Sequence, residues 1–482
     1  MDQQNQSNYT LLCDFYELTM GNAYYETGMG QKRAYFDLFF RTVPDGGGFA
    51  IAAGLEQVIQ YIKNLHFSDE DIAFLRDKKL FSEDFLNSLR GFRFTGDIYA
   101  VPEGTPVFPR EPILTVCAPA VEAQLVETFL LLSINHQSLI ATKANRIVRA
   151  AKGRPVSEFG SRRAQGADGA VLGARAAYIA GCAGTACTLT DRAYGVPAGG
   201  TMAHSWVQMF DSELDAFRTY CKIYPHNATL LVDTYHVLKS GVPNAIRAFK
   251  EVLLPQGIED CAIRIDSGDI TYLSKKARKM LDAAGYPDCG VCASNSLDEY
   301  LVRDLILQGA QVTNFGIGEN MITSKSDPVF GGVYKLAAVK DGGRYLPKIK
   351  ISETAEKTTI PHLKNLYRIY DNDTGKAMAD YITMADETVD VTDGITLFDP
   401  VETWKKRTFT NVRAERLNRP IYVNGKRVYE NPPLRDIRDF CAAQVATLWD
   451  EVTRFENPHR YYVDLSQKLW DERQRLLTEF GR

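Results

Sequence analysis

The stretch CAIRIDSGD, residues 261–269, is typical of a buried strand that ends in a polar loop. Its apolar positions surround Arg264, and the strand then gives way to two carboxylates, a hydroxyl and a glycine. The segment that follows, ITYLSKKARKMLDAAG at 270–285, has the spacing of an amphipathic helix. A strand followed by a long helix is the repeating unit of a parallel sheet.

The same alternation continues on both sides of this stretch. Further strands are expected at RPVSEFG (154–160), TLLVDTYH (229–236), GVCASNS (290–296) and VTNFGIGEN (312–320), and further helices at GADGAVLGARAAYIAG (166–181), VLKSGVPNAIRAFKEVL (237–253) and LDEYLVRDLILQG (297–309). So many units in succession predict an α/β fold with a closed or nearly closed β/α barrel. An open, doubly wound sheet is the alternative.

The rest of the chain divides around this barrel, which we assign to residues 151–345. Residues 1–150 are expected to form an N-terminal α/β domain that ends in a long helix at 121–151. Residues 346–482 are expected to form a C-terminal region. Its recognisable parts are a hairpin with an Asn-Gly turn, RPIYVNGKRVYE (419–430), and the amphipathic helices RDFCAAQVATLWDEVTRF (438–455) and DLSQKLWDERQRLLTEF (464–480).

Composition excludes several classes of partner. The chain has 482 residues, of which 45% are apolar, and a formal net charge of −4, so it carries no global basic field for nucleic acid. No run reaches the ~20 apolar residues of a membrane helix, and the start of the chain lacks the pattern of a signal peptide. Nine scattered cysteines predict reduced thiols and a cytoplasmic protein. The C-x-x-C of Cys289 and Cys292 lies in a strand-like run, so we expect no structural metal there.

The polar loop after residue 265 has two possible interpretations. Asp266 and Asp269 are candidates to hold Mg²⁺, because Mg²⁺ is commonly bound by one or two carboxylates together with substrate oxygens. Alternatively, Ser267 to Asp269 caps the helix that follows, since Ser and Asp are good N-caps. Capping does not explain Arg264, whose side chain lies one strand step from a carboxylate.

Other expected strand ends carry groups suited to a phosphorylated ligand. Arg162 lies at a strand–helix junction, and guanidinium groups bind phosphate bidentately. Its neighbour Phe159 can stack on a flat aromatic substrate or can be a core residue. Gly316 and Gly318 follow the last strand, where barrels often bind phosphate, although a simple turn would also use glycine there.

His204 follows a Gly-Gly-Thr loop that is able to present an imidazole to a site. A neutral imidazole is a nucleophile as well as a base. Asp233, at another strand end, is a candidate to orient the second ring nitrogen, as carboxylates do in catalytic triads. A satisfied structural histidine is the alternative.

Together these segments resemble the nicotinate phosphoribosyltransferase family over roughly residues 9–370. The resemblance is carried by LLCDFYELTM (11–20), NHQSLIATKA (135–144), EFGSRRAQG (158–166), GGTMAHSWV (199–207), LLVDTYHV (230–237), IRIDSGD (263–269), ASNSLDE (293–299), NFGIGEN (314–320) and LPKIKISETAEKTTIPHLKNLYRIYD (346–371). It implies an irregular, type II phosphoribosyltransferase-like β/α barrel. It also implies transfer of phosphoribosyl from 5-phosphoribosyl-1-diphosphate to nicotinate, which forms nicotinate mononucleotide and diphosphate in NAD biosynthesis. Mg²⁺ is implied as cofactor and ATP as co-substrate.

The resemblance also assigns roles to residues of the expected barrel. His204 stands at the family's transiently phosphorylated histidine, the step that couples ATP hydrolysis to transfer. Arg264, Asp266 and Asp269 match the loop that binds ribose and the magnesium diphosphate.

The remaining matches concern the two organic substrates and the assembly. Phe159 and Arg162 match a pair that stacks on the pyridine and binds phosphate. The 5′-phosphate loop and its neighbours are matched by Gly316, Gly318, Ser294 and Asn295. Asp14 and Tyr16 match a segment that completes the site of the neighbouring subunit, so the resemblance implies a homodimer with shared active sites.

Two positions bear on the alternatives. Relatives that use nicotinamide carry an acid in the segment that matches GTACT, and here Ala186 stands there, which favours an anionic substrate. His362 stands where relatives often have glycine. The alternatives are a nicotinamide phosphoribosyltransferase, a type I phosphoribosyltransferase, whose paired acids and Thr-Gly are lacking, and an inactive nucleotide-binding regulator, which should have lost His204 or the Asp266 loop.

Overall fold

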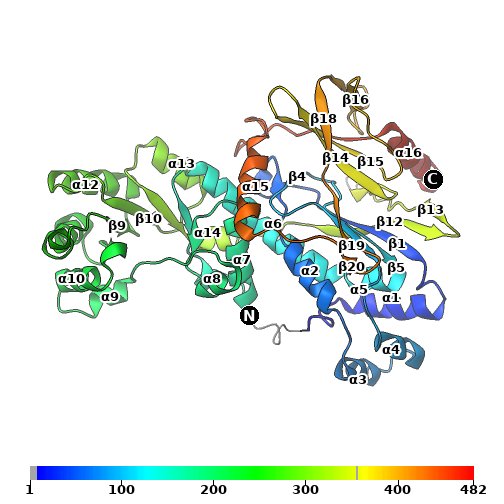
Figure 1. The fold of residues 1–482 in the computed structure, drawn as a ribbon, viewed down its shortest axis with the longest axis horizontal. Coiled ribbons are helices and arrows are strands. Elements are labelled where there is room, and N and C mark those ends of the chain that lie inside the picture. Colours follow the sequence, from blue (N-terminus) through cyan, green and yellow to red (C-terminus); the bar gives the residue numbers. More distant parts are fainter. Residues whose placement is uncertain (1–7, 354–356, 482) are drawn as a thin grey trace. The chain divides into compact units, whose positions relative to one another are not determined.

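The computed structural model describes residues 8–353 and 357–481 (Figure 1). Contacts divide the chain into two compact units. The parallel unit spans Ile140–Pro328, and the antiparallel unit joins the chain up to Leu139 with the chain from Val329 onward. The domain boundaries predicted at residues 150 and 345 stay a prediction. The contacts between residues group the first and last parts of the chain into one unit.

The parallel unit is built on a six-stranded sheet in which all neighbouring strands are parallel. The strand order is β7-β6-β11-β10-β9-β8, with β6 Val156–Glu158, β7 Gly184–Thr185, β8 Ala228–Leu231, β9 Cys261–Ile265, β10 Gly290–Ser294 and β11 Asn314–Ile317. The predicted α/β fold is confirmed. Since β7 and β8 are edge strands among the described residues, the sheet forms an incomplete, irregular barrel rather than a closed one.

Helices follow the strands as the alternation predicted. They are α7 Ala167–Ile179, α8 Thr188–Tyr194, α9 His204–Gln208, α10 Glu213–Ile223, α11 Val242–Ala248, α12 Ile270–Ala283, α13 Glu299–Leu307 and α14 Glu319–Ile322. The segment predicted as one helix at 237–253 differs, because π-helical turns at Val237–Gly241 and Phe249–Leu253 flank α11. Pro243, which has no N–H to donate, lies in the first turn of α11 and prevents a regular ladder there.

The antiparallel unit holds a seven-stranded sheet in the order β13-β12-β1-β5-β3-β19-β20. Its strands are β1 Arg33–Phe39, β3 Asp97–Ala100, β5 Leu114–Pro119, β12 Val333–Asp341, β13 Arg344–Pro347, β19 Arg419–Val423 and β20 Lys426–Arg427. A second sheet, β18-β14-β15-β21, contains β14 Lys364–Asp371, β15 Ala377–Met384, β18 Val412–Arg416 and β21 Val463–Leu465. Two small pairs are β2 Ala50–Ile51 with β4 Pro106–Val107, and β16 Ile395–Phe398 with β17 Lys406–Phe409.

The helices of this unit are α1 Phe15–Glu26, α2 Leu55–Asn64, α3 Asp69–Asp77, α4 Glu83–Leu89, α5 Ala120–Leu125, α15 Leu434–Ala446 and α16 Gln467–Phe480. The helix α6 Glu127–Ala150 begins in this unit and continues past Leu139 into the parallel unit. The long helix predicted at 121–151 is thus two helices that part at Val126. The helix predicted at 438–455 begins earlier, at Leu434, and ends at Ala446, so its second half is not helical.

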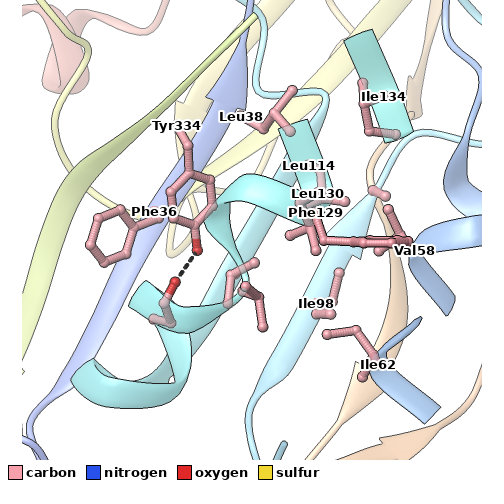
Figure 2. Close-up of a cluster of buried hydrophobic side chains, with 14 of the residues drawn as sticks. Phe36, Leu38, Val58, Ile62, Ile98, Leu114, Phe129, Leu130, Ile134 and Tyr334 are labelled. Atoms are coloured by element: carbon pink, nitrogen blue, oxygen red, sulfur yellow. Dashed lines mark hydrogen bonds between the residues drawn. The ribbon is translucent and has the colours of Figure 1, made fainter. Parts of the chain in front are cut away.

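The core of the antiparallel unit contains residues from both ends of the chain (Figure 2). Phe36 on β1 and Tyr334 on β12 stack with ring centroids 4.7 Å apart, and the Tyr334 hydroxyl donates to the Ala123 carbonyl at 2.8 Å. Leu38 and Leu114 are fully buried beside them. This burial of apolar surface explains why residues about three hundred positions apart form one unit.

Residues with positive φ occur in two turns of the same unit. The predicted hairpin is confirmed, and Asn424 and Gly425 both have positive φ, as a type I′ turn requires. His362 has φ 76°, a conformation that favours glycine, and this is the position where the resemblance implies glycine.

In the part of the chain that the structure describes, no helix combines the length and the apolar content that crossing a bilayer requires.

Candidate active site

The side chain of Arg264, near the end of β9, connects three loops at the carboxyl edge of the parallel sheet. Its guanidinium donates to Asp266 Oδ1 at 3.0 Å, to Ser294 Oγ at 2.8 Å and to Thr201 Oγ1 at 3.2 Å. The Ser294 hydroxyl in turn donates to Asp266 Oδ1. The contacts come from β9, the end of β10 and the loop before α9. A single cation therefore joins segments far apart in the sequence.

His204, the first residue of α9, lies beside this network. Its Nδ1 is 3.1 Å from Thr234 Oγ1, and its Nε2 is 3.9 Å from Asp266 Oδ2. The sequence pointed to Asp233 as the group that orients the imidazole, and here the structure differs. Asp233 Oδ2 instead accepts from the Asp266 backbone N–H at 3.2 Å and from Ser267 Oγ at 2.5 Å. Asp233 thus fixes the loop that carries Asp266, while Thr234 contacts the ring.

Phe159 follows β6 at the same edge. The guanidinium carbon of Arg264 lies 5.6 Å from its ring centroid, within the range of a cation–π contact. The ring also packs on Gly316 of β11, where an added Cβ would stand 2.5 Å from Phe159 Cδ2. Gly318 is the N-cap of α14, close to the Phe159 carbonyl. Glycine at 316 therefore makes room for the aromatic ring. This packing role is separate from the phosphate binding predicted for its backbone.

A buried carboxylate anchors the loop after β6. Glu158 is fully buried and accepts from Thr185 Oγ1 at 2.7 Å and from the Gly160 N–H. Burial raises the pKa of this carboxyl, although both hydrogen bonds oppose the shift. Arg162 lies in the next turn, Ser161–Arg163, and its side chain is exposed. The guanidinium thus stands on a fixed backbone with its donors open to solvent.

Two predicted residues occupy loop positions at this edge. Asp269 is exposed and caps α12, because its Oδ1 accepts from the Tyr272 N–H at 2.8 Å. The capping alternative therefore explains Asp269, but it does not explain Arg264 or Asp266. Asn295 follows β10 with φ 94°, an uncommon conformation for a residue with a side chain.

Asp14 and Tyr16 belong to the antiparallel unit, at the start of α1. Both are exposed. The other predicted residues gather at the carboxyl edge of the parallel sheet. Sequence reasoning gave no role to Thr201 and Thr234, and it considered Ser267 only as part of a helix cap. They lie inside the segments that carried the resemblance, and hydroxyls next to the charged candidates are the signal that could have identified them.

Three family models match the chain. The description "Nicotinate phosphoribosyltransferase (NAPRTase) family" covers residues 155–378. The N-terminal domain of nicotinate phosphoribosyltransferase matches residues 11–135, and its C-terminal domain matches residues 363–473. Taken together, the matches extend over nearly all of both units.

Curated relatives and solved structures agree with this. The nicotinate phosphoribosyltransferase of Bacillus subtilis is 42% identical over 470 residues, which cover 98% of this chain and 95% of the relative. A nicotinate phosphoribosyltransferase of Mycobacterium tuberculosis is 39% identical over 468 residues, or 97% of this chain and 93% of the relative. The crystal structure of human nicotinic acid phosphoribosyltransferase matches with a TM-score of 0.82 at 28% identity and covers 98% of this chain and 100% of its own. A nicotinate-nucleotide pyrophosphorylase from Pyrococcus furiosus shares the fold, with a TM-score of 0.70 at 23% identity over 93% of this chain and 99% of its own.

The contact between Gly316 and Phe159 gives a prediction about packing. Gly316→Ala should lower the free energy of unfolding by about 1–3 kcal/mol, because the new methyl group overlaps the ring. In a Phe159→Ala background the same substitution should cost much less, since the overlapping atoms are gone. Chemical denaturation of the four proteins measures this coupling. Gly91→Ala is the control, because its Cβ would meet open space. An equal cost in both backgrounds would show that the ring is not what Gly316 accommodates.

Proposed function

Because the chain belongs to the nicotinate phosphoribosyltransferase family, we propose that it transfers phosphoribosyl from 5-phosphoribosyl-1-diphosphate to nicotinate. The products are nicotinate mononucleotide and diphosphate, a step of NAD biosynthesis. We further propose that ATP hydrolysis is coupled to this transfer through phosphorylation of His204.

The observation that carries the proposal is the network around Arg264. One guanidinium holds Asp266, Ser294 and Thr201, and His204 lies 3.9 Å from Asp266. The family resemblance gives Arg264, Asp266 and Ser294 roles in binding the phosphorylated sugar and gives His204 a role in phosphoryl transfer, whereas Thr201 was found only in the structure. Their contact in one network supports a single site for both reactions.

The environment of Phe159 supports an anionic, flat acceptor. Phe159 offers a ring for stacking, and Arg162 offers exposed N–H donors nearby. Ala186, where relatives that use nicotinamide have an acid, donates its N–H to the Glu158 carbonyl at 2.8 Å and therefore lies next to Phe159 in space. The absence of a carboxylate side chain at position 186 favours nicotinate over nicotinamide.

Asp266 has the position of a group that stabilises developing positive charge. When the diphosphate leaves the ribose, the sugar gains oxocarbenium character, and an anionic carboxylate becomes more stabilising as the bond breaks. Hydrogen bonds from Arg264 and Ser294 fix Asp266 Oδ1, so the carboxylate needs little reorganisation during reaction. The pyridine nitrogen is already a nucleophile, so the protein mainly positions it.

The donor set fits a magnesium ion that arrives with its substrate. In the described part of the chain, no group of three or more His, Cys, Asp and Glu side chains is arranged to hold a metal. Asp233 Oδ1 is buried without a hydrogen-bond partner among the described atoms, next to the loop of Asp266 and Asp269. Asp266 and Asp269 would hold the ion together with substrate oxygens. When bound, Mg²⁺ neutralises charge on the departing diphosphate.

We propose that His204 accepts a phosphoryl group on Nε2. Thr234 occupies Nδ1, so Nε2 is the ring nitrogen that faces Asp266. Attack of Nε2 on the γ-phosphorus of ATP forms the N–P bond as ADP leaves, and water later releases phosphate. The added negative charge next to Asp266 and Arg264 is a local switch for the site.

We propose a homodimer in which Asp14 and Tyr16 complete the active site of the second subunit. Their exposure at the start of α1 leaves them available for such a contact. The nine cysteines are all free thiols, which supports a reducing compartment such as the cytoplasm.

Product analysis tests the proposal directly. The protein is incubated with phosphoribosyl diphosphate, Mg²⁺ and either nicotinate or nicotinamide, with and without ATP, and products are separated by chromatography. We expect nicotinate mononucleotide and diphosphate, formed faster with ATP, and little product from nicotinamide. Equal or preferred use of nicotinamide would contradict the proposed substrate, and no mononucleotide from either would favour an inactive nucleotide-binding protein.

Replacing the histidine separates the two coupled reactions. His204→Ala should keep slow transfer but lose stimulation by ATP and the acid-labile phosphoryl label on the protein. Thr234→Val is a matched variant that retains the imidazole but removes its contact, so ATP stimulation should fall only in part. Full ATP-coupled turnover in His204→Ala would rule out the phosphohistidine.

Asp266 should affect turnover rather than nicotinate binding. We expect Asp266→Ala to lower kcat by roughly 10²–10³-fold with a much smaller change in the KM for nicotinate, by analogy with the loss of a group that stabilises transition-state charge. Asp266→Asn keeps the shape and an acceptor for Arg264 but lacks the charge, and it should also be slow. Steady-state kinetics at saturating phosphoribosyl diphosphate measures both, and a pure KM effect would contradict the assigned role.

A further inference from the structure

The start of α1 is tied to the first turn of α6 through one threonine. The Asp14 N–H donates to Thr128 Oγ1 at 3.1 Å. Thr128 donates twice to Glu17 Oε1, from its hydroxyl at 2.5 Å and from its backbone N–H at 3.1 Å. All of these residues belong to the antiparallel unit.

The direction of these bonds is fixed by the number of protons available. A threonine hydroxyl has one proton, and an amide N–H can only donate. Since Thr128 Oγ1 accepts from Asp14, its own proton goes to Glu17. Glu17 therefore sets the orientation of the hydroxyl that holds Asp14.

Glu17 is a buried group that the proposed reaction does not use. Its residue is fully buried, and its Oε2 has no hydrogen-bond partner among the described atoms. Burial raises the pKa of this carboxyl to about 7, and the charge of Glu127 adds to the shift while the bonds from Thr128 oppose it. A neutral carboxyl can still accept at Oε1, so the contact with Thr128 is kept.

Tyr16 lies next to a second residue of the same turn. Burial raises the pKa of the Tyr16 phenol, and the nearby carboxylate of Glu127, which accepts from Gln124 Nε2 at 2.7 Å, adds to the shift. Tyr16 nevertheless remains 43% exposed. The phenol therefore lies beside a buried carboxylate while a large part of the residue stays accessible.

We propose that Thr128, Glu17 and Glu127 are positioning residues that hold Asp14 and Tyr16 in the orientation with which they enter the active site of a second subunit. This inference rests on the shared site of the proposed function. The three residues act through Asp14 and Tyr16 and not by touching substrate. A rigid support is needed because a small misplacement of a substrate-positioning group is costly in rate or affinity.

Isosteric variants of Thr128 test the inference. Thr128→Val removes the hydroxyl but keeps the shape, and it should raise the KM for nicotinate by about three- to tenfold, the loss that one hydrogen bond represents, with a much smaller change in kcat. Thr128→Ser restores the hydroxyl and should behave like the parent protein. Ser68→Ala, which removes the N-cap hydrogen bond of α3, is the control for lost stability alone and should leave the KM unchanged.

Tyr16→Phe is a second variant that carries little risk of misfolding, because the residue is partly exposed. It keeps the aromatic ring and removes the hydroxyl that interacts with the Glu127 carboxylate, so it should also raise the KM for nicotinate. Thermal unfolding of every variant is measured beside the kinetics.

Tyr16→Ala distinguishes the possible failures. If Tyr16→Ala raises the KM while Thr128→Val and Tyr16→Phe do not, the positioning role is overturned and the shared site stands. If Tyr16→Ala also leaves the kinetics unchanged, the shared site fails and the inference fails with it. A raised KM in Thr128→Val that Thr128→Ser does not restore also overturns the inference, because the effect would then not come from the hydroxyl.

Discussion

The charge of Arg264 is the constraint around which the candidate site is organised. A guanidinium in a largely buried place, with 14% of its side chain exposed, needs compensating acceptors. Asp266, Ser294 and Thr201 supply them from three loops, and Asp233 fixes the Asp266 backbone in turn. Satisfying one cation therefore sets the geometry of the carboxylate that faces His204, and the site is ordered before any substrate binds.

Packing and chemistry share residues at this edge of the sheet. Gly316 belongs to a strand and lacks a side chain where the Phe159 ring packs, so the ring is held by the sheet itself. Asp269 caps α12 with one oxygen and remains exposed. The same principle applies in the antiparallel unit, where buried Glu17 and Glu127 support exposed residues of α1. In each case a packing contact or a hydrogen bond to a neighbouring residue fixes the position of the group.

Patterns in the sequence predicted the alternation of strands and helices along the parallel unit, because periods of two and of 3.6 residues are local properties. They failed where a local pattern competes with another constraint. The helix expected at 237–253 forms, but with π-helical turns on both sides of α11, and the segment after Ala446 is amphipathic but not helical. The two-residue strand β7 is too short to leave any periodic signal. Asp233 was expected at the imidazole, and spacing alone could not show that Thr234, one residue later, faces it.

From the residue pattern we could predict which segments alternate, which residues follow each strand, and hence which groups could meet at the carboxyl edge of a parallel sheet. Tertiary structure alone decided which of those groups touch: Thr234 rather than Asp233 on His204, Phe159 on Gly316, and Thr128 between Asp14 and Glu17. The physical reason is that the strength of a hydrogen bond or a ring contact changes when the distance between its atoms changes by a few tenths of an ångström, and that it also depends on direction. These quantities arise when remote segments pack, and no spacing along the chain encodes them directly.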